Sequence, residues 1–309
     1  MKKLILHLLL VLPLVSFSTE KDNVFLFSYF KGNGEDGLHL AYSRDGLSFL
    51  ALNNDKSFLA PKVGVSKLMR DPCIIKTDDG IYHMVWTAGW TERGIGYASS
   101  KDLINWSEQK YIMVMEKEPT ARNCWAPEII YDRKNKQFLI FWATTIPGRF
   151  PDTEKIGDTG YNHRIYFVTT KDLKSFSETK LFYDKSFNVI DATIIKGRKN
   201  YVMFVKDETR TPPQKNIRVT TSGSLYGPYS SPSEPITGKY WAEGPTSVKM
   251  NDTWFVYFDK YTEKKMGAVI SKNLNKWEDI SERINFPDGV RHGTIFKVNG
   301  KTLDSLLNR

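Results

Sequence analysis

The feature that most constrains this chain is a short pattern that it repeats. An apolar, strand-like run ends in Ser or Thr, a polar turn follows, and an aromatic residue opens the next run. Copies occupy residues 41–49, 96–106, 166–176 and 269–277, with a degraded copy at 219–229. Internal repetition of this kind is the sequence signature of a repeat architecture. The chain is therefore expected to fold as several copies of one β-unit.

A second recurring feature is a polar or acidic residue at the start of the first apolar run of each unit. The five starts are Arg70-Asp71-Pro72, Trp125-Ala126-Pro127-Glu128, Ile190-Asp191-Ala192, Trp241-Ala242-Glu243-Gly244-Pro245 and Arg291-His292-Gly293. Four complete units of about four strands each follow, at residues 71–111, 125–181, 191–229 and 243–280. A fifth unit is split: residues 291–298 supply its first strand, and the others come from residues 24–30, 38–43 and 49–52.

These units predict an all-β protein, a single five-bladed β-propeller whose fifth blade is closed by the N- and C-terminal strands. Segments with helical periodicity are nearly absent, and the units have the size of propeller blades. A split blade closes the ring and leaves no open sheet edge. Two separate β domains are the alternative. Residues 146–164 are too long for a hairpin loop, and we expect either a wall of the central pocket or a surface loop.

The N-terminus has the pattern of a secretory signal peptide. Lys2 and Lys3 precede an apolar run, residues 4–15, that is too short to span a bilayer. We therefore expect residues 1–18 to be a signal peptide, residues 19–309 to be the propeller, and the protein to be exported without a membrane span. In an exported protein Cys73 and Cys124 could form one disulfide, or they are two buried free thiols.

The formal net charge of +9 comes from Lys and Arg residues that are scattered, not bunched in runs. Such a distribution is typical of a solvated surface. An acidic polysaccharide is compatible with this charge, whereas nucleic acid is not expected as a partner of an exported protein. We expect a monomer.

In a propeller the first strand of each blade lines the central channel, so residues at the five starts become neighbours in space. Asp71, Asp191, Glu243 and His292 hold such positions in four different units. Converging carboxylates raise one another's pKa. Glycoside hydrolysis uses this arrangement, because one carboxyl must carry a proton for the leaving oxygen while another must be ionised to activate water.

These residues, in this order and at blade spacing, resemble glycoside hydrolase family 43, whose members are five-bladed propellers acting with inversion on arabinose-, xylose- and galactose-containing glycans. The resemblance covers essentially all of the chain after residue 18. It implies that Asp71 is the general base, Glu243 the general acid, and Asp191 the carboxylate that orients the acid and tunes its pKa. It further implies that His292 is the channel histidine, which in some members reaches a calcium ion or a water cluster. No cofactor is required, and a structural calcium ion in the channel is allowed.

Two residues depart from the family pattern. Ala192 stands where the family often has Pro, and Glu128 ends a second-blade signature, Trp125-Ala126-Pro127, that usually ends in Asp. The departures at Ala192 and Glu128 could both alter the sugar subsite. The fructan-cleaving propellers share a motif like the one at Asp71, but their Asn-Asp-Pro-Asn nucleophile is absent from this chain.

Substrate binding needs aromatic faces for sugar rings and planar donors for hydroxyl groups. The candidates are Trp86, Trp90, Trp125, Arg210, Trp241 and Arg291. Trp142 and Trp254 are better explained by core packing, and Trp106 and Trp277 belong to the repeat.

Two functions fit the sequence. The first is an inverting, exo-acting hydrolase of oligo- or polysaccharides, of the α-L-arabinofuranosidase or β-xylosidase type. The second is a propeller that binds glycans without cleaving them, because a fold does not fix a function. Retention of all three acids favours the first, and the sugar cannot be read from the sequence.

Overall fold

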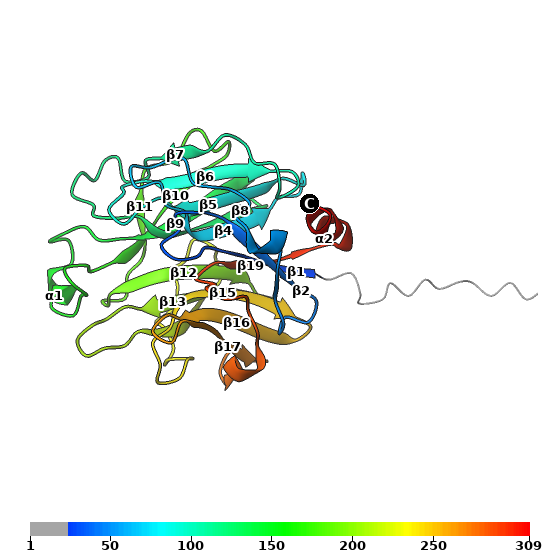
Figure 1. Ribbon diagram of the computed structural model, residues 1–309. Coiled ribbons are helices and arrows are strands. Elements are labelled where there is room, and N and C mark those ends of the chain that lie inside the picture. Colours follow the sequence, from blue (N-terminus) through cyan, green and yellow to red (C-terminus); the bar gives the residue numbers. More distant parts are fainter. Residues whose placement is uncertain (1–23) are drawn as a thin grey trace, which may run out of the picture.

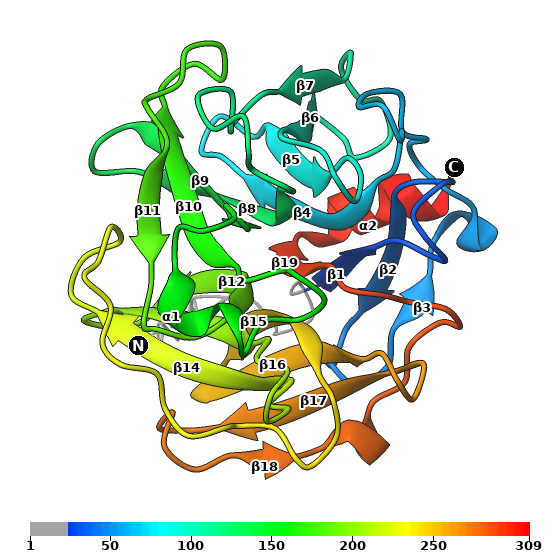
Figure 2. The ribbon, with the colours of Figure 1, turned by 90° about the vertical axis from the view of Figure 1, so that its left-hand side faces the viewer.

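The computed structural model describes residues 24–309, so the predicted signal peptide lies outside the described residues. These residues form five antiparallel sheets arranged around one axis, as Figures 1 and 2 show. The predicted all-β, five-bladed propeller is confirmed. In Figure 2 the innermost strands, one from each sheet, surround the centre of the ring.

The blades follow one another along the chain, and each begins at its innermost strand. Blade 1 comprises β4 (Arg70–Lys76), β5 (Tyr82–Thr87), β6 (Ile95–Ser100) and β7 (Lys110–Ile112). Blade 2 comprises β8 (Trp125–Asp132), β9 (Gln137–Thr144), β10 (Arg164–Thr170) and β11 (Lys180–Tyr183). Blade 3 comprises β12 (Val189–Lys196), β13 (Tyr201–Asp207) and β14 (Asn216–Ser222). Blade 4 comprises β15 (Glu243–Met250), β16 (Thr253–Lys260), β17 (Lys265–Ser271) and β18 (Glu278–Asp279).

Blade 5 joins the two ends of the described chain. Its strands are β19 (Thr294–Val298), β1 (Val24–Tyr29), β2 (His39–Ser43) and β3 (Leu50–Ala51). β19 pairs with β1 in antiparallel register from Val24 opposite Val298 to Ser28 opposite Thr294. The predicted closure by terminal strands is therefore present. The C-terminal helix α2 (Gly300–Leu307) follows β19 and buries Leu303 and Leu306 against this blade and blade 1.

The repeated sequence pattern is a repeated turn. In blade 1 the Ser100 hydroxyl accepts the Leu103 N–H at 2.8 Å, and Asp102 Oδ1 accepts the next two N–H groups. Leu103 has φ of 66°, and its carbonyl accepts the Trp106 indole N–H at 3.2 Å. The same hydroxyl-to-backbone bond recurs at Ser43, Thr170 and Ser271. Each turn satisfies its own backbone groups, which explains why the motif can be recognised in sequence.

Blade 3 has three strands instead of the expected four. The segment that would form its outer strand runs beside β14, and the N–H groups of Ser230, Ser233 and Ile236 donate to β14 carbonyls at 2.8–2.9 Å. Pro232 and Pro235 interrupt it, because proline cannot donate to a ladder. The segment therefore covers the edge without becoming a regular strand.

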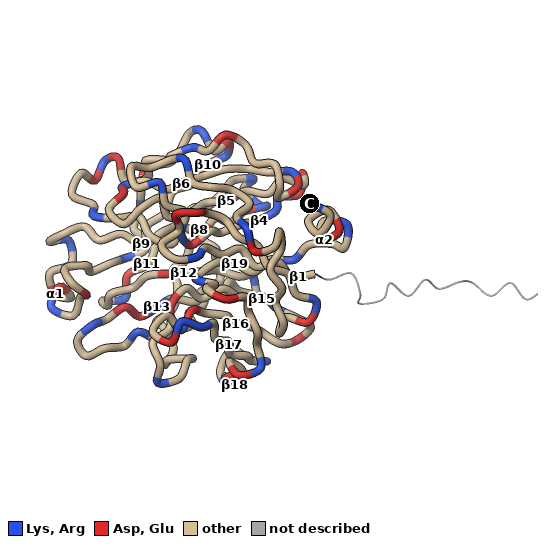
Figure 3. The backbone as a smooth tube through the Cα atoms, in the orientation of Figure 1, with Lys and Arg blue, Asp and Glu red and all other residues tan. Residues whose placement is uncertain are grey.

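The core lies between neighbouring blades in five hydrophobic clusters, one for each pair of facing sheets. Trp142 and Trp254 are buried there, as expected. Cys73 and Cys124 are both buried free thiols. In residues 24–309 no helix is long and apolar enough to cross a membrane. Basic and acidic residues are interspersed along the chain (Figure 3), consistent with the scattered pattern in the sequence.

Candidate functional site

The backbone at the start of the innermost strands aims polar side chains into the channel. In blades 1 to 4 the pairing of the first strand with the second shifts register there, which marks a β-bulge. The bulge residues Asp71, Ala126, Asp191 and Gly244 have φ of 52°, 47°, 51° and 59°. Left-handed conformations are costly for residues other than glycine and concentrate at functional sites. At Gly244 a Cβ atom would lie 2.2 Å from the His292 ring, so only glycine allows this packing.

The starts of the strands open onto one cavity of about 430 Å³ at this end of the channel. Asp71, Asp191, Glu243 and His292 all line it, as the sequence predicted. The remaining lining residues are Gly32, Asn33, Arg70, Thr87, Trp90, Trp125, Ile190, Lys206, Glu208, Tyr261 and Arg291. All five blades, or the loops that join their strands, therefore contribute to the cavity.

Asp71 is held as a carboxylate. Its Oδ2 accepts the Thr87 hydroxyl at 2.7 Å, and its Oδ1 lies 3.2 Å from His292 Nδ1. The Thr87 oxygen in turn accepts the Ala126 N–H at 2.8 Å, which directs the hydroxyl proton to Asp71. Burial would raise the pKa of Asp71, but the hydrogen bond and charge of His292, with Arg70 and Thr87, lower it to about 2. Asp71 is thus ionised at neutral and mildly acidic pH.

His292 is held as a cation. Burial would lower its pKa, but the hydrogen bond and charge of Asp71, with Asp191 and Glu243, raise it to about 9. Within residues 24–309 no group of three or more His, Cys, Asp and Glu side chains is arranged to hold a metal ion. The geometry places His292 as the partner of Asp71, while its predicted contact with a metal stays a prediction.

Glu243 is surrounded by cations. Its Oε2 lies 2.9 Å from Lys206 Nζ, and its Oε1 lies 3.2 Å from Arg291 Nη2. Arg291 also pairs with buried Asp259. Burial would raise the pKa of Glu243, but Lys206, Arg291 and His292 outweigh it and lower the pKa.

Asp191 differs from both. Its Oδ2 accepts the Gly244 N–H at 2.9 Å, which links it to the backbone directly after Glu243. Burial raises its pKa to about 6 against the charges of His292 and Lys206, and the charges of Glu243 and Asp71 add to that rise. Asp191 and Glu243 therefore interact and titrate as a pair. The protonated Glu243 that the resemblance implies stays a prediction, and the sequence did not indicate the two cations that contact Glu243.

The aromatic candidates divide by position. Trp90 and Trp125 line the cavity and contact each other edge to face, with ring centroids 5.5 Å apart. The prediction for Trp86 is wrong: its side chain is fully buried between blades 5 and 1. Successive residues of a strand face opposite sides of the sheet, so Thr87 points into the cavity and Trp86 away from it.

Two other candidates lie outside the cavity lining. The Arg210 guanidinium lies over the Trp241 ring at 5.3 Å, and that ring neighbours Tyr261, which does line the cavity, at 6.0 Å. Trp241 is therefore one residue removed from the cavity, and Arg210 is two residues removed. Arg291, by contrast, both lines the cavity and contacts Glu243.

The long segment between β9 and β10 is anchored without lining the cavity. It contains the short helix α1 (Pro151–Glu154), and its Asp158 pairs with buried Lys215. Its Tyr161 ring lies 4.8 Å from the Trp125 ring. The segment is thus neither a wall of the cavity nor a free surface loop, because its Tyr161 packs against Trp125, which lines the cavity.

Glu128, the residue that departs from the family signature, lies deeper in the channel. It is buried, and its Oε2 accepts the Thr193 hydroxyl at 3.1 Å. Burial raises its pKa to about 7, although the charge of His292 acts against the rise. Glu128 does not line the cavity.

Sequence reasoning missed the residues that second strands contribute. Thr87, Lys206 and Asp259 stand opposite Arg70, Ile190 and Glu243 in the registers of blades 1, 3 and 4. Each ends or nearly ends an apolar run, as in Val202-Met203-Phe204-Val205-Lys206. A charged residue in that position was a usable signal, because an unpaired charge in such a run is costly.

Comparison with known proteins agrees with this geometry. The model of the family described as "Probable glycosyl hydrolase domain", which is related to glycoside hydrolase family 43, matches residues 20–304. An α-L-arabinofuranosidase of Bifidobacterium longum is 24% identical over 249 residues, which are 67% of this chain and 23% of that protein. The chain thus spans about a quarter of the length of this relative.

Solved structures share the fold. A thermostable family-43 glycoside hydrolase aligns with a TM-score of 0.53 and 16% identity, over 74% of this chain and 82% of that one. An α-L-arabinofuranosidase from Lactobacillus brevis aligns with a TM-score of 0.54 and 17% identity, over 69% of this chain and 72% of that one. An exo-β-1,3-galactanase from Phanerochaete chrysosporium aligns with a TM-score of 0.53 and 12% identity, over 72% of this chain and 52% of that one. At these identities the likeness concerns the fold alone.

Proposed function

The chain belongs to the glycosyl hydrolase family related to family 43, and we propose that it is an inverting hydrolase that removes terminal arabinose, xylose or galactose residues from plant glycans. The observation that carries the proposal is the opening of three carboxylates from three blades onto one cavity. The names of the similar arabinofuranosidases and galactanase motivate the choice of sugars.

The proposed reaction begins at Asp71. Its carboxylate accepts a proton from a water molecule whose oxygen attacks the anomeric carbon. Ionisation of Asp71 in the free cavity suits this role, because a base must be unprotonated before it acts. Thr87 and His292 hold the carboxylate in place while it waits for the proton.

The leaving oxygen takes its proton from Glu243 as the glycosidic bond breaks. The proton that Glu243 needs is available in the pair that it forms with Asp191, since two interacting carboxyls share their protons. After the reaction Asp71 carries the proton from water and Glu243 is ionised. Exchange with solvent restores both, and the released sugar has the inverted configuration.

A panel of nitrophenyl α-L-arabinofuranosides, β-xylosides and β-galactosides tests the activity, and proton NMR of the first sugar anomer released tests inversion. Hydrolysis of at least one glycoside with an inverted first product is expected. The Asp71→Asn/Glu243→Gln double variant is the matched control for contaminating glycosidases. A retained anomer would overturn the mechanism.

The second function, glycan binding without cleavage, is favoured by one observation: Glu243 is held ionised between two cations, which opposes proton donation. Calorimetry with arabino-, xylo- and galacto-oligosaccharides separates the two functions. Binding of an oligosaccharide that stays intact over a day would overturn the hydrolase proposal and leave the binding function.

A further inference from the structure

The cavity contains a buried lysine that the proposed reaction does not use. Lys206 ends the apolar run of β13, and its side chain is only 2% exposed. Its Nζ lies 2.9 Å from Glu243 Oε2 and 2.6 Å from Glu208 Oε2, and 4.7 Å from the centre of the Tyr261 ring. One buried ammonium group therefore stands between two carboxylates, only one of which is assigned to the chemistry.

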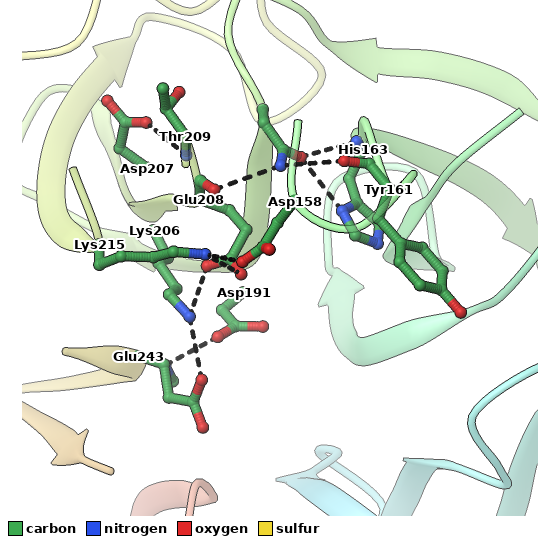
Figure 4. A network of polar contacts seen from close by, with 12 residues as sticks. Asp158, Tyr161, His163, Asp191, Lys206, Asp207, Glu208, Thr209, Lys215 and Glu243 are labelled. Carbon is green, nitrogen blue, oxygen red and sulfur yellow. Dashed lines mark hydrogen bonds and ion pairs between the residues drawn. The ribbon is translucent and has the colours of Figure 1, made fainter. Parts of the chain in front are cut away.

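Glu208 is itself shared between two lysines. Figure 4 shows Lys206 and Lys215 converging on it. Lys215, which is 1% exposed, lies 2.6 Å from Glu208 Oε1 and also pairs with Asp158 of the long segment between β9 and β10. A continuous chain of ion pairs thus runs from that segment to Glu243.

Removing one partner of a buried ion pair leaves the other charge uncompensated, which is strongly unfavourable. A proton donor that faces a buried lysine meets this problem each time it takes up a proton. Here, when Glu243 is protonated, every nearby cation still has another carboxylate. The remaining pairs are Lys206 with Glu208, Lys215 with Asp158, and Arg291 with Asp259.

We propose that Lys206 and Glu208 are positioning residues for Glu243: Lys206 holds the Glu243 carboxylate in the cavity, and Glu208 keeps Lys206 neutralised while Glu243 carries its proton. The inference deepens the proposed function, because it assumes that Glu243 is the proton donor. Neither residue needs to contact the reacting atoms.

The charged groups around Glu243 come from several elements, and all of them act on its titration. Lys206 comes from β13, Asp191 from β12, Asp259 from β16, and Arg291 with His292 from the segment before β19. Of these, only Lys206 is also paired with Glu208, the residue that directly follows β13. Changes at Lys206 and at Glu208 therefore have opposite effects on Glu243.

The test uses Lys206→Met and Glu208→Gln in the full chain. Loss of the cation at 206 raises the affinity of Glu243 for a proton, so the alkaline limb of kcat/KM moves up by about one to three pH units. Loss of the carboxylate at 208 leaves Glu243 as the only carboxylate that neutralises Lys206, so the alkaline limb moves to lower pH. Lys260→Met is the matched control, since Lys260 is also buried, paired with Glu263 at 2.8 Å and stacked on Tyr240 at 4.1 Å. In this variant the alkaline limb of kcat/KM stays in place.

A second readout needs no substrate. Carbon-13 NMR of proteins labelled at the glutamate carboxyl, with Glu243→Gln to assign the signal, follows the titration of Glu243 itself. Opposite shifts in the two variants without any glycoside hydrolysis would support the ion-pair network while the proposed function fails. Shifts in the same direction, no shift, or a higher KM with an unchanged pH profile would overturn the inference. If Lys206→Met does not fold, Lys206→Gln and the Glu208→Gln variant decide it.

Discussion

The two sides of the cavity hold their carboxylates in different ways. On the Asp71 side, formed by Asp71, Thr87 and His292, one carboxylate has one cation and one hydroxyl donor. On the Glu243 side, formed by Glu243, Asp191, Lys206, Glu208, Arg291 and Asp259, four carboxyls and two cations form one cluster. A single pair fixes one protonation state over a wide pH range. In a cluster, interacting carboxyls share a proton that can pass from one to another, which suits a group that must give its proton away.

The largest expected effect separates the two sides by the leaving group. Asp71→Asn should lower kcat by about 10²–10⁴-fold on every substrate, because the attacking water then loses its base. Glu243→Gln should lower it as much for alkyl glycosides but little for dinitrophenyl glycosides, whose leaving oxygen needs no proton. Steady-state kinetics with both kinds of glycoside measure this difference. Equal losses on both would break the comparison.

The next effect concerns pH. Between about pH 3 and 6, kcat/KM should stay level, because Asp71, with its pKa of about 2, is already ionised. Above about pH 6 it should fall tenfold per pH unit, because the Asp191–Glu243 pair then loses its shared proton. A pH–rate profile measures both limits. Asp191→Asn should displace the alkaline limit, and a limit unchanged by that substitution would assign the proton elsewhere.

A smaller effect is on stability. A histidine whose pKa rises on folding stabilises the fold fully below its unfolded pKa of about 6.5, and that contribution is lost as the pH rises through its folded pKa of about 9. The free energy of unfolding should therefore fall by on the order of 3 kcal/mol over this window. Urea unfolding at several pH values measures the fall. His292→Gln should flatten it, and an equally steep fall in that variant would show that another group titrates.

The smallest expected effect compares aromatic residues on the two sides. Trp90 lines the cavity beside Arg70, which lies 4.2 Å from its ring, whereas Trp241 lies behind Tyr261 on the Glu243 side. Trp90→Ala should raise KM about fivefold, corresponding to roughly 1 kcal/mol of lost ring contact. Trp241→Ala should change KM less. The reverse order would place the sugar on the other side of the cavity.

The fold could be predicted because its repeat is a local structure. The turn at Ser100, Asp102 and Leu103 satisfies its own backbone groups, so its residues stand close together in the sequence. The missing fourth strand of blade 3 is also local in origin, since Pro232 and Pro235 interrupt it. The closure of blade 5 by the N- and C-terminal strands could be predicted because the fifth sequence unit is split between the two ends of the chain.

The site could be predicted only in part. Asp71, Asp191 and Glu243 were found because each stands at the start of the first apolar run of a unit, where the structure has a β-bulge. Lys206 was missed because its role depends on the register between β12 and β13 and on the neighbouring blade. The protonation of Glu243 could not be read either, since it depends on cations that lie 37 and 48 residues away in the sequence.

The pairing of β19 with β1 has a consequence for folding. Arg291 and His292 precede the strand that closes the ring, and they contact carboxylates of blades 4 and 1. Until this C-terminal segment has folded onto the ring, Asp71 and Glu243 therefore lack these partners. Catalytic competence should depend on the segment through Val298, and a polypeptide that ends before it should be inert even with all three acids present.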